Sequence, residues 1–197
     1  WGYFSHILYI AVPIIVVLVC KRSLKTYGLT LSDWRYNIKW GILLVLLVII
    51  PIFLSVLMGL TLVEGDLDQP YYILSTLIFQ FIFAGFGEEV LFRGYYQSRL
   101  NEGFGRNFRV FNLEFGWGVF ITAILFGLVH VLFWPRLFIG GFQINIMSGV
   151  YTGMIGLVLG FVREKSESIL APSLMHGLWD CTVVFLVQDG IFTILSI

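Results

Sequence analysis

The stretch GFGEEVLFRG, Gly85 to Gly94, places two adjacent glutamates and an arginine inside a strongly apolar part of the chain. Charged side chains at membrane depth are costly to insert, so they usually face the interior of a helix bundle and serve a function. Glu89 and Arg93 are four residues apart, on one helix face and in the order that favours an ion pair. Glu88 points about 100° away on the same helix, so its partner must come from elsewhere in the chain.

Few other ionisable side chains occur in apolar segments. His130 lies in FGLVH, and His176 lies in HGLWD with Asp180 one turn later on the same helix face. The third histidine, His6, falls near the outer end of the first apolar segment, where we expect it at the membrane interface. A helix rise of about 1.5 Å per residue allows Glu88, His130 and His176 to meet in mid-membrane, nearer the cytoplasmic side.

Such a set of side chains could hydrolyse a carbonyl bond without a serine, a cysteine or a metal. A carboxylate can act as general base on water, and a histidine beside it can orient that water or shuttle its proton. A second histidine can donate to a developing oxyanion. No GxSxG motif occurs, and Cys181 has no catalytic context.

Zinc is the second enzymatic interpretation, because zinc accepts histidine and carboxylate ligands. The candidate ligands are Glu88, Glu89, His130 and His176. The chain has no HExxH motif, and Arg93 beside the glutamates opposes a cation. A metal-free mechanism with no cofactor therefore ranks first, and zinc ranks below it.

The composition indicates an integral membrane protein. The chain has 197 residues, of which 58% are hydrophobic and 12% charged, with a mean hydropathy of +0.91. Soluble domains usually carry about 25% charged residues. The length suits a single domain over residues 1–197. The net charge is zero, so nothing indicates a nucleic-acid partner, and the expected surroundings are the lipid bilayer.

Apolar segments predict an all-α, polytopic bundle with about six transmembrane helices, since a spanning helix needs about 20 mostly apolar residues. The predicted spans are 3–20, 38–62, 71 to beyond 93, 116–134, 142–162 and 168–188. Two small-xxx-small pairs on the fifth span, Gly149/Gly153 and Gly156/Gly160, predict close packing against another helix.

The basic residues predict the orientation of these spans. The odd-numbered loops hold ten lysines and arginines, whereas the even-numbered loops hold only Arg136. By the positive-inside rule, the odd-numbered loops face the cytoplasm. A site formed by Glu88 and the two histidines then needs a cavity that opens to the cytoplasmic side.

Three motifs together resemble a known family. Glu88-Glu89-x-x-x-Arg93, Phe126-x-x-x-His130 and His176-x-x-x-Asp180 occur in this order on separate predicted spans. Together they resemble the CPBP family, which includes type II CAAX prenyl endopeptidases and bacteriocin-processing or Abi-like immunity membrane proteins. The resemblance covers residues 71–184.

This resemblance implies a glutamate-type intramembrane peptidase. Glu88 would be the general base, and His130 would help to hold the water. His176 and Asp180 would stabilise the oxyanion, while Glu89, Arg93 and Phe126 would support the site. The implied partner is a peptide or protein substrate, in some members lipidated.

Asp180 departs from the asparagine that is frequent at this position in the prenyl endopeptidase branch. An ionised aspartate cannot donate to an oxyanion, so Asp180 is either protonated, which burial favours, or it orients His176 or a water. Prenylated CAAX peptides, leader peptides and C-terminal sorting tails all stay open as substrates. A non-catalytic immunity, scaffold or partner-binding protein with the same fold is the alternative from another class. A proton-coupled transporter would also bury such residues, but no inverted repeat supports one.

Overall fold

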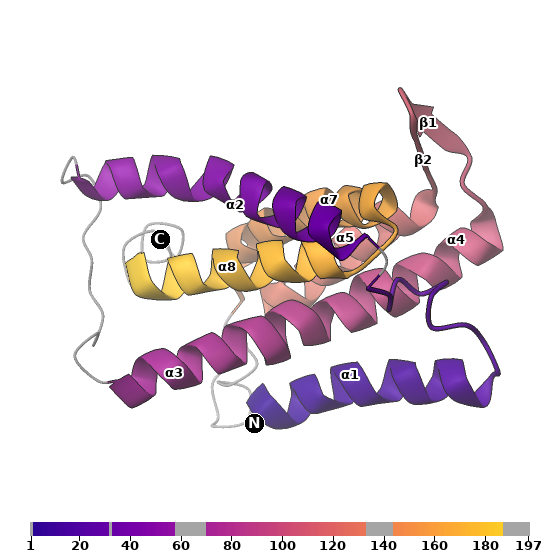
Figure 1. The fold of residues 1–197 in the computed structure, drawn as a ribbon, viewed down its shortest axis with the longest axis horizontal. Coiled ribbons are helices and arrows are strands. Elements are labelled where there is room, and N and C mark those ends of the chain that lie inside the picture. Colours follow the sequence, from indigo (N-terminus) through magenta and orange to yellow (C-terminus); the bar gives the residue numbers. More distant parts are fainter. Residues whose placement is uncertain (1, 32, 58–69, 133–143, 187–197) are drawn as a thin grey trace.

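The structure, a computed structural model, describes residues 2–31, 33–57, 70–132 and 144–186. This part of the chain is almost entirely helical (Figure 1). The elements in chain order are α1 (Gly2–Val19), α2 (Trp34–Leu57), α3 (Pro70–Ile78), η1 (Phe79–Glu88), η2 (Val90–Gln97), α4 (Ser98–Phe104), β1 (Phe108–Val110), β2 (Leu113–Phe115), α5 (Trp117–Val131), α7 (Ile146–Ser166) and α8 (Leu170–Leu186).

The centre of the fold is one long helix formed by α3, η1, η2 and α4, which follow one another without a break (Figure 1). Its middle, η1 and η2, is π-helical, the winding defined by hydrogen bonds between residues five apart. This winding is uncommon, and it occurs most often at functional sites. Glu89 stands between the two π-helical segments, and Glu88 is the last residue of the first. The widened part of the helix therefore carries the two acidic residues.

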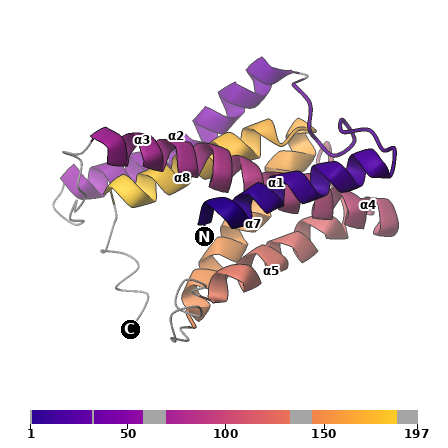
Figure 2. The ribbon, with the colours of Figure 1, turned by 90° about the horizontal axis from the view of Figure 1, so that it is seen from below.

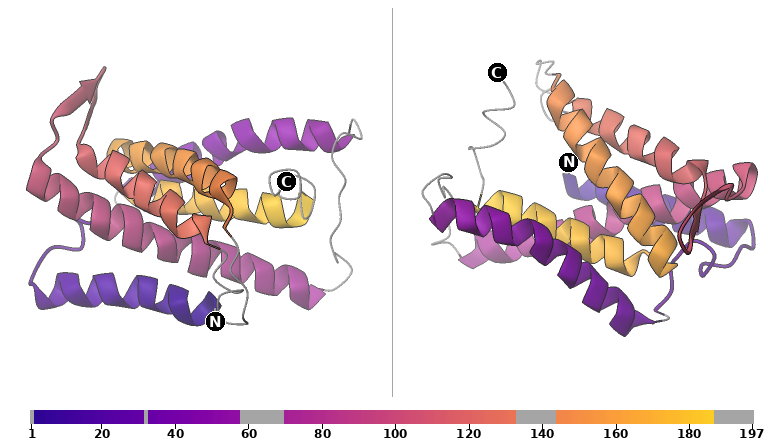
Figure 3. Two further views of the ribbon diagram at one scale, coloured as in Figure 1. Left: turned by 180° about the vertical axis from the view of Figure 1, so that it is seen from behind. Right: turned by 90° about the horizontal axis from the view of Figure 1, so that it is seen from above.

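The other helices surround this long helix. α8 packs against η1 and also against α2, so it lies between α2 and the long helix (Figure 1). α1 packs against η1 and η2 from the other side (Figure 2). α5 and α7 form a closely packed pair that crosses the bundle and contacts η2 (Figure 3). Four helices thus converge on the middle of the long helix.

Among the described residues, three helices are long and apolar enough to cross a membrane. They are Gly2–Val19, the 32-residue helix Ile73–Phe104 and Ile146–Ser166. Trp117–Val131 is apolar but shorter. The prediction of six transmembrane helices is therefore not confirmed as a number, although the helical class is. The even-numbered loops predicted around residues 62–70 and 134–142, with Arg136, lie largely outside the described residues.

A side-chain cap and a left-handed residue mark the two ends of α7. The Asn145 side chain accepts a hydrogen bond from the Ser148 N–H at 2.8 Å, a standard N-terminal cap. At the other end Glu167 adopts a left-handed conformation, with φ at 53°, which stops the helix. The chain then turns directly into α8, where the Leu170 N–H donates to the Ser168 hydroxyl at 3.1 Å. The short turn fixes where α8 begins relative to α7.

Glycines allow α5 and α7 to approach closely, as the Gly149/Gly153 pair predicts. A Cβ added at Gly127 of α5 would lie 2.5 Å from the Gly149 carbonyl oxygen and 3.1 Å from the Gly153 Cα. A Cβ added at Gly149 would lie 2.3 Å from the Val131 side chain. Larger residues do not fit there, because interiors are close-packed. The prediction of close packing on this helix is confirmed.

The second pair, Gly156/Gly160, faces the long helix and exposes its carbonyl groups to polar side chains. Arg93 donates to the Gly156 carbonyl at 3.0 Å, and Gln97 donates to the Gly160 carbonyl at 3.0 Å. One turn further, the Glu164 carboxylate accepts from Gln97 at 2.7 Å and from Asn101 at 2.6 Å. We define these contacts as the polar ladder. It joins the long helix to α7 by pairing every fourth residue on both helices.

A third close approach, between η1 and α8, brings His176 beside Glu89 of the long helix. A Cβ added at Gly85 would lie 2.8 Å from the Gly177 backbone nitrogen and 2.9 Å from its Cα. Gly177 follows His176 directly, so this backbone contact sets the distance between His176 and the long helix. Neither of these atoms belongs to a side chain that could rotate away.

Gly85→Ala is expected to destabilise the protein by roughly 1–3 kcal/mol, since the new methyl group forces η1 and α8 apart. The measurement is the apparent thermal unfolding midpoint in detergent micelles. Gly103→Ala is the matched control, because a Cβ at Gly103 meets nothing within 4 Å and alanine favours a helix by up to about 1 kcal/mol. Equal midpoints for the two variants would contradict the proposed close contact.

Candidate active site

Glu88 lies at the end of η1, with its side chain only 12% exposed. Its carboxylate oxygen Oε1 is 2.9 Å from Nε2 of His6, which is on α1. The predicted position of His6 at the membrane interface did not anticipate this contact. The prediction placed His6 by its distance from the end of an apolar segment, whereas α1 begins beside the middle of the long helix (Figure 1).

The second oxygen of Glu88 faces two further histidines. Oε2 is 4.0 Å from Nε2 of His130 on α5 and 3.9 Å from Nε2 of His176 on α8. It is buried and makes no hydrogen bond within the described part of the chain. Glu88 therefore finds its partners on other helices, as its position on the helical wheel predicts. The meeting of Glu88, His130 and His176 is also as predicted.

The ring of His130 is oriented by its own helix. Nδ1 lies 2.7 Å from the Phe126 carbonyl oxygen. A carbonyl can only accept a hydrogen bond, so Nδ1 must carry a proton and donate it. In the neutral ring the other nitrogen, Nε2, then has a free lone pair, and this nitrogen is the one that faces Glu88. The motif spacing Phe126-x-x-x-His130 thus has a direct structural reason.

Glu89 forms a separate and fully buried unit with Arg93. Both side chains are 0% exposed, and Arg93 Nη1 donates to Glu89 Oε1 at 2.8 Å. The same oxygen is 3.0 Å from Nδ1 of His176. Because an ionised carboxylate can only accept, Nδ1 of His176 is the donor. Glu89 and Arg93 are paired as predicted, and the pair also holds the ring of His176.

Arg93 is enclosed by groups that suit a cation. Its Nη2 donates to the Gly156 carbonyl of α7, and its guanidinium carbon lies 4.3 Å above the Phe126 ring. A cation over an aromatic face is attracted by the ring, more strongly where water is excluded. Phe126 also packs edge to face on the His176 ring, with centroids 5.7 Å apart. Phe126 therefore lies between the ion pair and the histidines, as a wall of the site.

Asp180 lies one turn after His176 on α8. Its Oδ2 is 3.3 Å from Nε2 of His176, and its side chain is 28% exposed. His176 thus has a carboxylate on each ring nitrogen, Glu89 on one and Asp180 on the other. Of the alternatives for Asp180, this geometry favours contact with His176.

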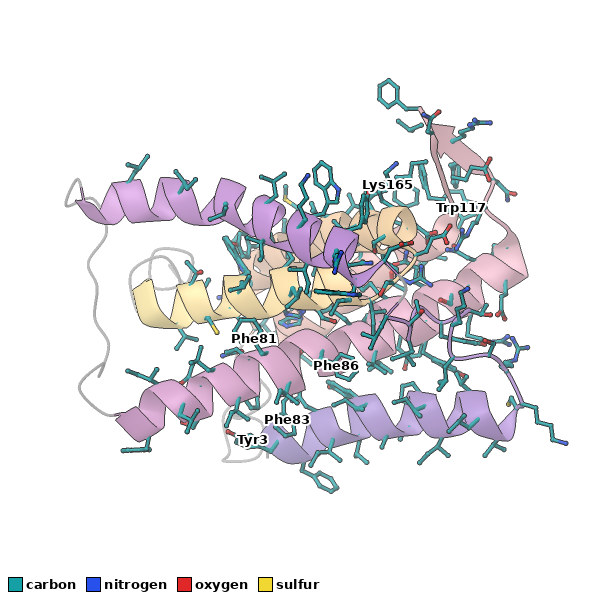
Figure 4. The ribbon with its side chains drawn as sticks, in the orientation of Figure 1. Tyr3, Phe81, Phe83, Phe86, Trp117 and Lys165 are labelled. Atoms are coloured by element: carbon teal, nitrogen blue, oxygen red, sulfur yellow. The ribbon has the colours of Figure 1, made fainter. Side chains whose placement is uncertain are left out.

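Aromatic side chains close the site on the side of α1. Tyr3 lies between α1 and the long helix, beside Phe83 (Figure 4). Their ring centroids are 4.9 Å apart, and Tyr3 is also 5.0 Å from Phe79. The His6 ring meets Phe79 edge to face at 5.2 Å. These contacts anchor the first turns of α1 beside Glu88.

The structure also bears on metal binding. Among the described residues, no group of three or more histidine, cysteine, aspartate or glutamate side chains is arranged to hold a metal ion. Three of the four candidate zinc ligands, Glu88, His130 and His176, do lie close together. The fourth, Glu89, has its Oε1 engaged by Arg93.

Sequence reasoning missed His6 and the polar ladder. For His6 a signal was present, because the cost of burying a polar group in an apolar span applies to it as it does to His130. For the ladder the signal was the matching spacing of Gln97 and Asn101 on one helix and Gly160 and Glu164 on another. Only the fold shows that these two helices are neighbours.

The fold is a helical bundle whose apolar helices carry buried carboxylates and imidazoles. Such a combination is typical of a membrane protein with a functional site inside the bundle. The chain matches the family model of Rce1-like type II CAAX prenyl endopeptidases over residues 70–182, more than half of its length. It therefore belongs to this family, which is a family of peptidases and a branch of the one that the motifs resemble. No curated protein and no solved structure matched the chain.

Arg93→Met is expected to destabilise the protein by about 3–5 kcal/mol, because it leaves the buried Glu89 carboxylate without its cation. Unfolding in a detergent titration measures this loss. The matched control is Arg99→Met, which breaks an ion pair with Glu102 that is partly exposed on both sides. Exposed pairs contribute little, so this control should stay close to the wild type. Similar losses in both variants would contradict a special role for the buried pair.

Proposed function

We propose that this protein is an intramembrane glutamate-type endopeptidase that hydrolyses a peptide bond with a water molecule activated by Glu88. One observation carries the proposal. Glu88 has one oxygen engaged by His6, while the other faces Nε2 of His130 and of His176 at about 4 Å. Family membership supports peptidase chemistry at the coarser level.

The spacing around Glu88 suits a bridging water. Separations of 3.9 Å and 4.0 Å are too long for direct hydrogen bonds. Polar groups at such distances are commonly joined through one water. A water between Glu88 Oε2 and His130 Nε2 could donate one proton to each of them. Its oxygen lone pair would then point away from both, toward a substrate carbonyl.

The reaction then follows ordinary general-base catalysis. The water oxygen attacks the peptide carbonyl carbon, while Glu88 Oε2 takes one proton from the water. The carbonyl double bond becomes a single bond to an oxyanion. When the oxyanion collapses, the carbon–nitrogen bond breaks, and the proton held by Glu88 passes to the leaving amine. The products are a carboxylic acid and an amine, and transfer of the acid proton to the amine leaves a carboxylate and an ammonium group. Glu88 is then a carboxylate again, and the enzyme returns to its starting state.

His176 is the proposed electrophile for the oxyanion. Its Nδ1 donates to Glu89, so Nε2 can donate as well only when the ring is an imidazolium. Glu89 and Asp180 flank that ring with negative charge, and Arg93 offsets part of it from behind. A fixed donor near the reacting carbonyl stabilises developing charge without reorganisation. Asp180 acts through His176 in this scheme and does not donate to the oxyanion itself.

The proposed substrate is a peptide segment that reaches the site from the cytoplasmic side, the side to which the positive-inside rule assigns the basic loops. Family membership favours a prenylated CAAX sequence. The contact between Asp180 and His176 is compatible with that substrate and also with a leader or C-terminal sorting peptide. The choice among these peptides therefore depends on which of them the protein binds, and the proposed reaction is the same for each.

The test is cleavage in liposomes of synthetic peptides ending in CAAX, with and without a farnesylated cysteine, and of leader and sorting peptides, read by mass spectrometry. Glu88→Gln and His130→Ala are each expected to lower kcat at least about 100-fold, since general acid–base catalysis contributes this much. His176→Ala is expected to do the same through the lost oxyanion donor. Cys20→Ser, at an exposed cysteine, is the control.

The same assay separates the alternatives. Loss of product in all three folded variants, with no effect of excess chelator, supports the glutamate mechanism. Loss of product on adding chelator to the wild-type protein would replace it with a zinc peptidase. Undiminished cleavage of a peptide by all three variants would show that these three residues are not catalytic. Binding of a peptide without any cleavage by the wild type would favour a scaffold or immunity protein.

A further inference from the structure

His6 contacts Glu88 from outside the segment that matches the family model, which begins at residue 70. It is carried by α1, and its side chain is 13% exposed. The chain has three histidines, and each has Nε2 within 4.0 Å of the Glu88 carboxylate. His6 is the nearest of the three, at 2.9 Å, and the only one bound to Oε1 among the described residues.

The hydrogen bonds of His6 restrict its proton. Nδ1 lies 2.6 Å from the Gly2 carbonyl oxygen, so Nδ1 must be a donor. The contact between Nε2 and Glu88 Oε1 then shares a single proton, which belongs either to an imidazolium or to a carboxylic acid. Oε1 is occupied in both cases, and the imidazolium form is the one that leaves Glu88 as the carboxylate required by the proposed mechanism. Oε2 is the oxygen that stays directed at His130 and His176.

We propose that His6 is a positioning residue for Glu88: it binds Oε1 so that Oε2 alone acts on the water. The inference rests on the proposed function, because it assigns a second role within the same site. Catalytic groups act well only when they are held close to the productive geometry, and a displacement of about 1 Å can cost about 100-fold in rate. A Glu88 side chain with no partner on Oε1 could rotate away from the histidines.

The packing of α1 shows that this contact is built into the fold. Gly87, the neighbour of Glu88, lets α1 approach, because a Cβ there would lie 3.3 Å from the Ile10 side chain and 3.4 Å from the His6 carbonyl oxygen. Tyr3 packs edge to face on Phe79 and Phe83 one turn before His6. The first turns of α1 are thus held on both sides of the His6 ring.

The first experiment needs no substrate. The protein, labelled with ¹⁵N-histidine in detergent micelles, should give three sets of imidazole signals, and His6→Gln identifies the set that belongs to His6. In Glu88→Leu the His6 signals are expected to shift, because Nε2 loses its partner. Unchanged His6 signals in Glu88→Leu would overturn the proposal whether or not a substrate is known.

The second experiment separates positioning from folding by kinetics on a cleaved peptide. His6→Leu is expected to lower kcat roughly 10- to 100-fold with little change in KM. His6→Gln should recover most of that loss, since its amide nitrogen can donate to Oε1 from the place of imidazole Nε2. Ile7→Ala, at an exposed position on α1, should match the wild type.

The outcomes distinguish the two proposals. If Glu88→Gln is inactive while His6→Leu retains the wild-type kcat, the role of His6 is wrong and the proposed function stands. If Glu88→Gln retains activity, the proposed function fails first. If His6→Leu and His6→Gln lose kcat equally and unfold at a lower temperature than Ile7→Ala, His6 serves the packing of α1 and the positioning role is overturned.

Discussion

The site depends on the charge of Arg93, which is buried with no exposed surface and must be neutralised where it lies. Glu89 supplies the opposite charge, the Gly156 carbonyl takes a second hydrogen bond, and Phe126 covers the cation with its ring. These three groups come from the long helix, α7 and α5. Since an uncompensated charge in this interior is costly, the three elements are constrained to meet at one point.

The two adjacent glutamates, Glu88 and Glu89, have different environments. Glu89 accepts hydrogen bonds from the Arg93 cation and the His176 imidazole N–H on Oε1, while its Oε2 is buried with no hydrogen bond among the described residues. Glu88 forms no ion pair with a cation of its own helix among the described residues, and three histidines surround its carboxylate. The π-helical winding places both side chains at the crossing of four helices.

The sequence predicted the contacts among the site residues better than their surroundings. Spacing along one helix predicts Glu89 with Arg93 and His176 with Asp180, because residues four apart share a face. The meeting of Glu88, His130 and His176 follows from the cost of polar groups in apolar spans. The contact of His6 with Glu88 was not predicted, because the position of His6 was inferred from the end of an apolar segment. Such an end does not show where a helix starts relative to its neighbours. The π-helical winding leaves no periodic signal.

The polar ladder restricts how the long helix can move against α7. Donors and acceptors recur at intervals of one helical turn, at Arg93 and Gln97 on one side and at Gly156 and Gly160 on the other. A small slide breaks both hydrogen bonds at once, and new ones form only after a displacement of a whole turn, about 5.4 Å. Such a step would carry Glu89 out of reach of His176. The ladder therefore favours discrete registers of the long helix against α7, because positions between them lose both hydrogen bonds.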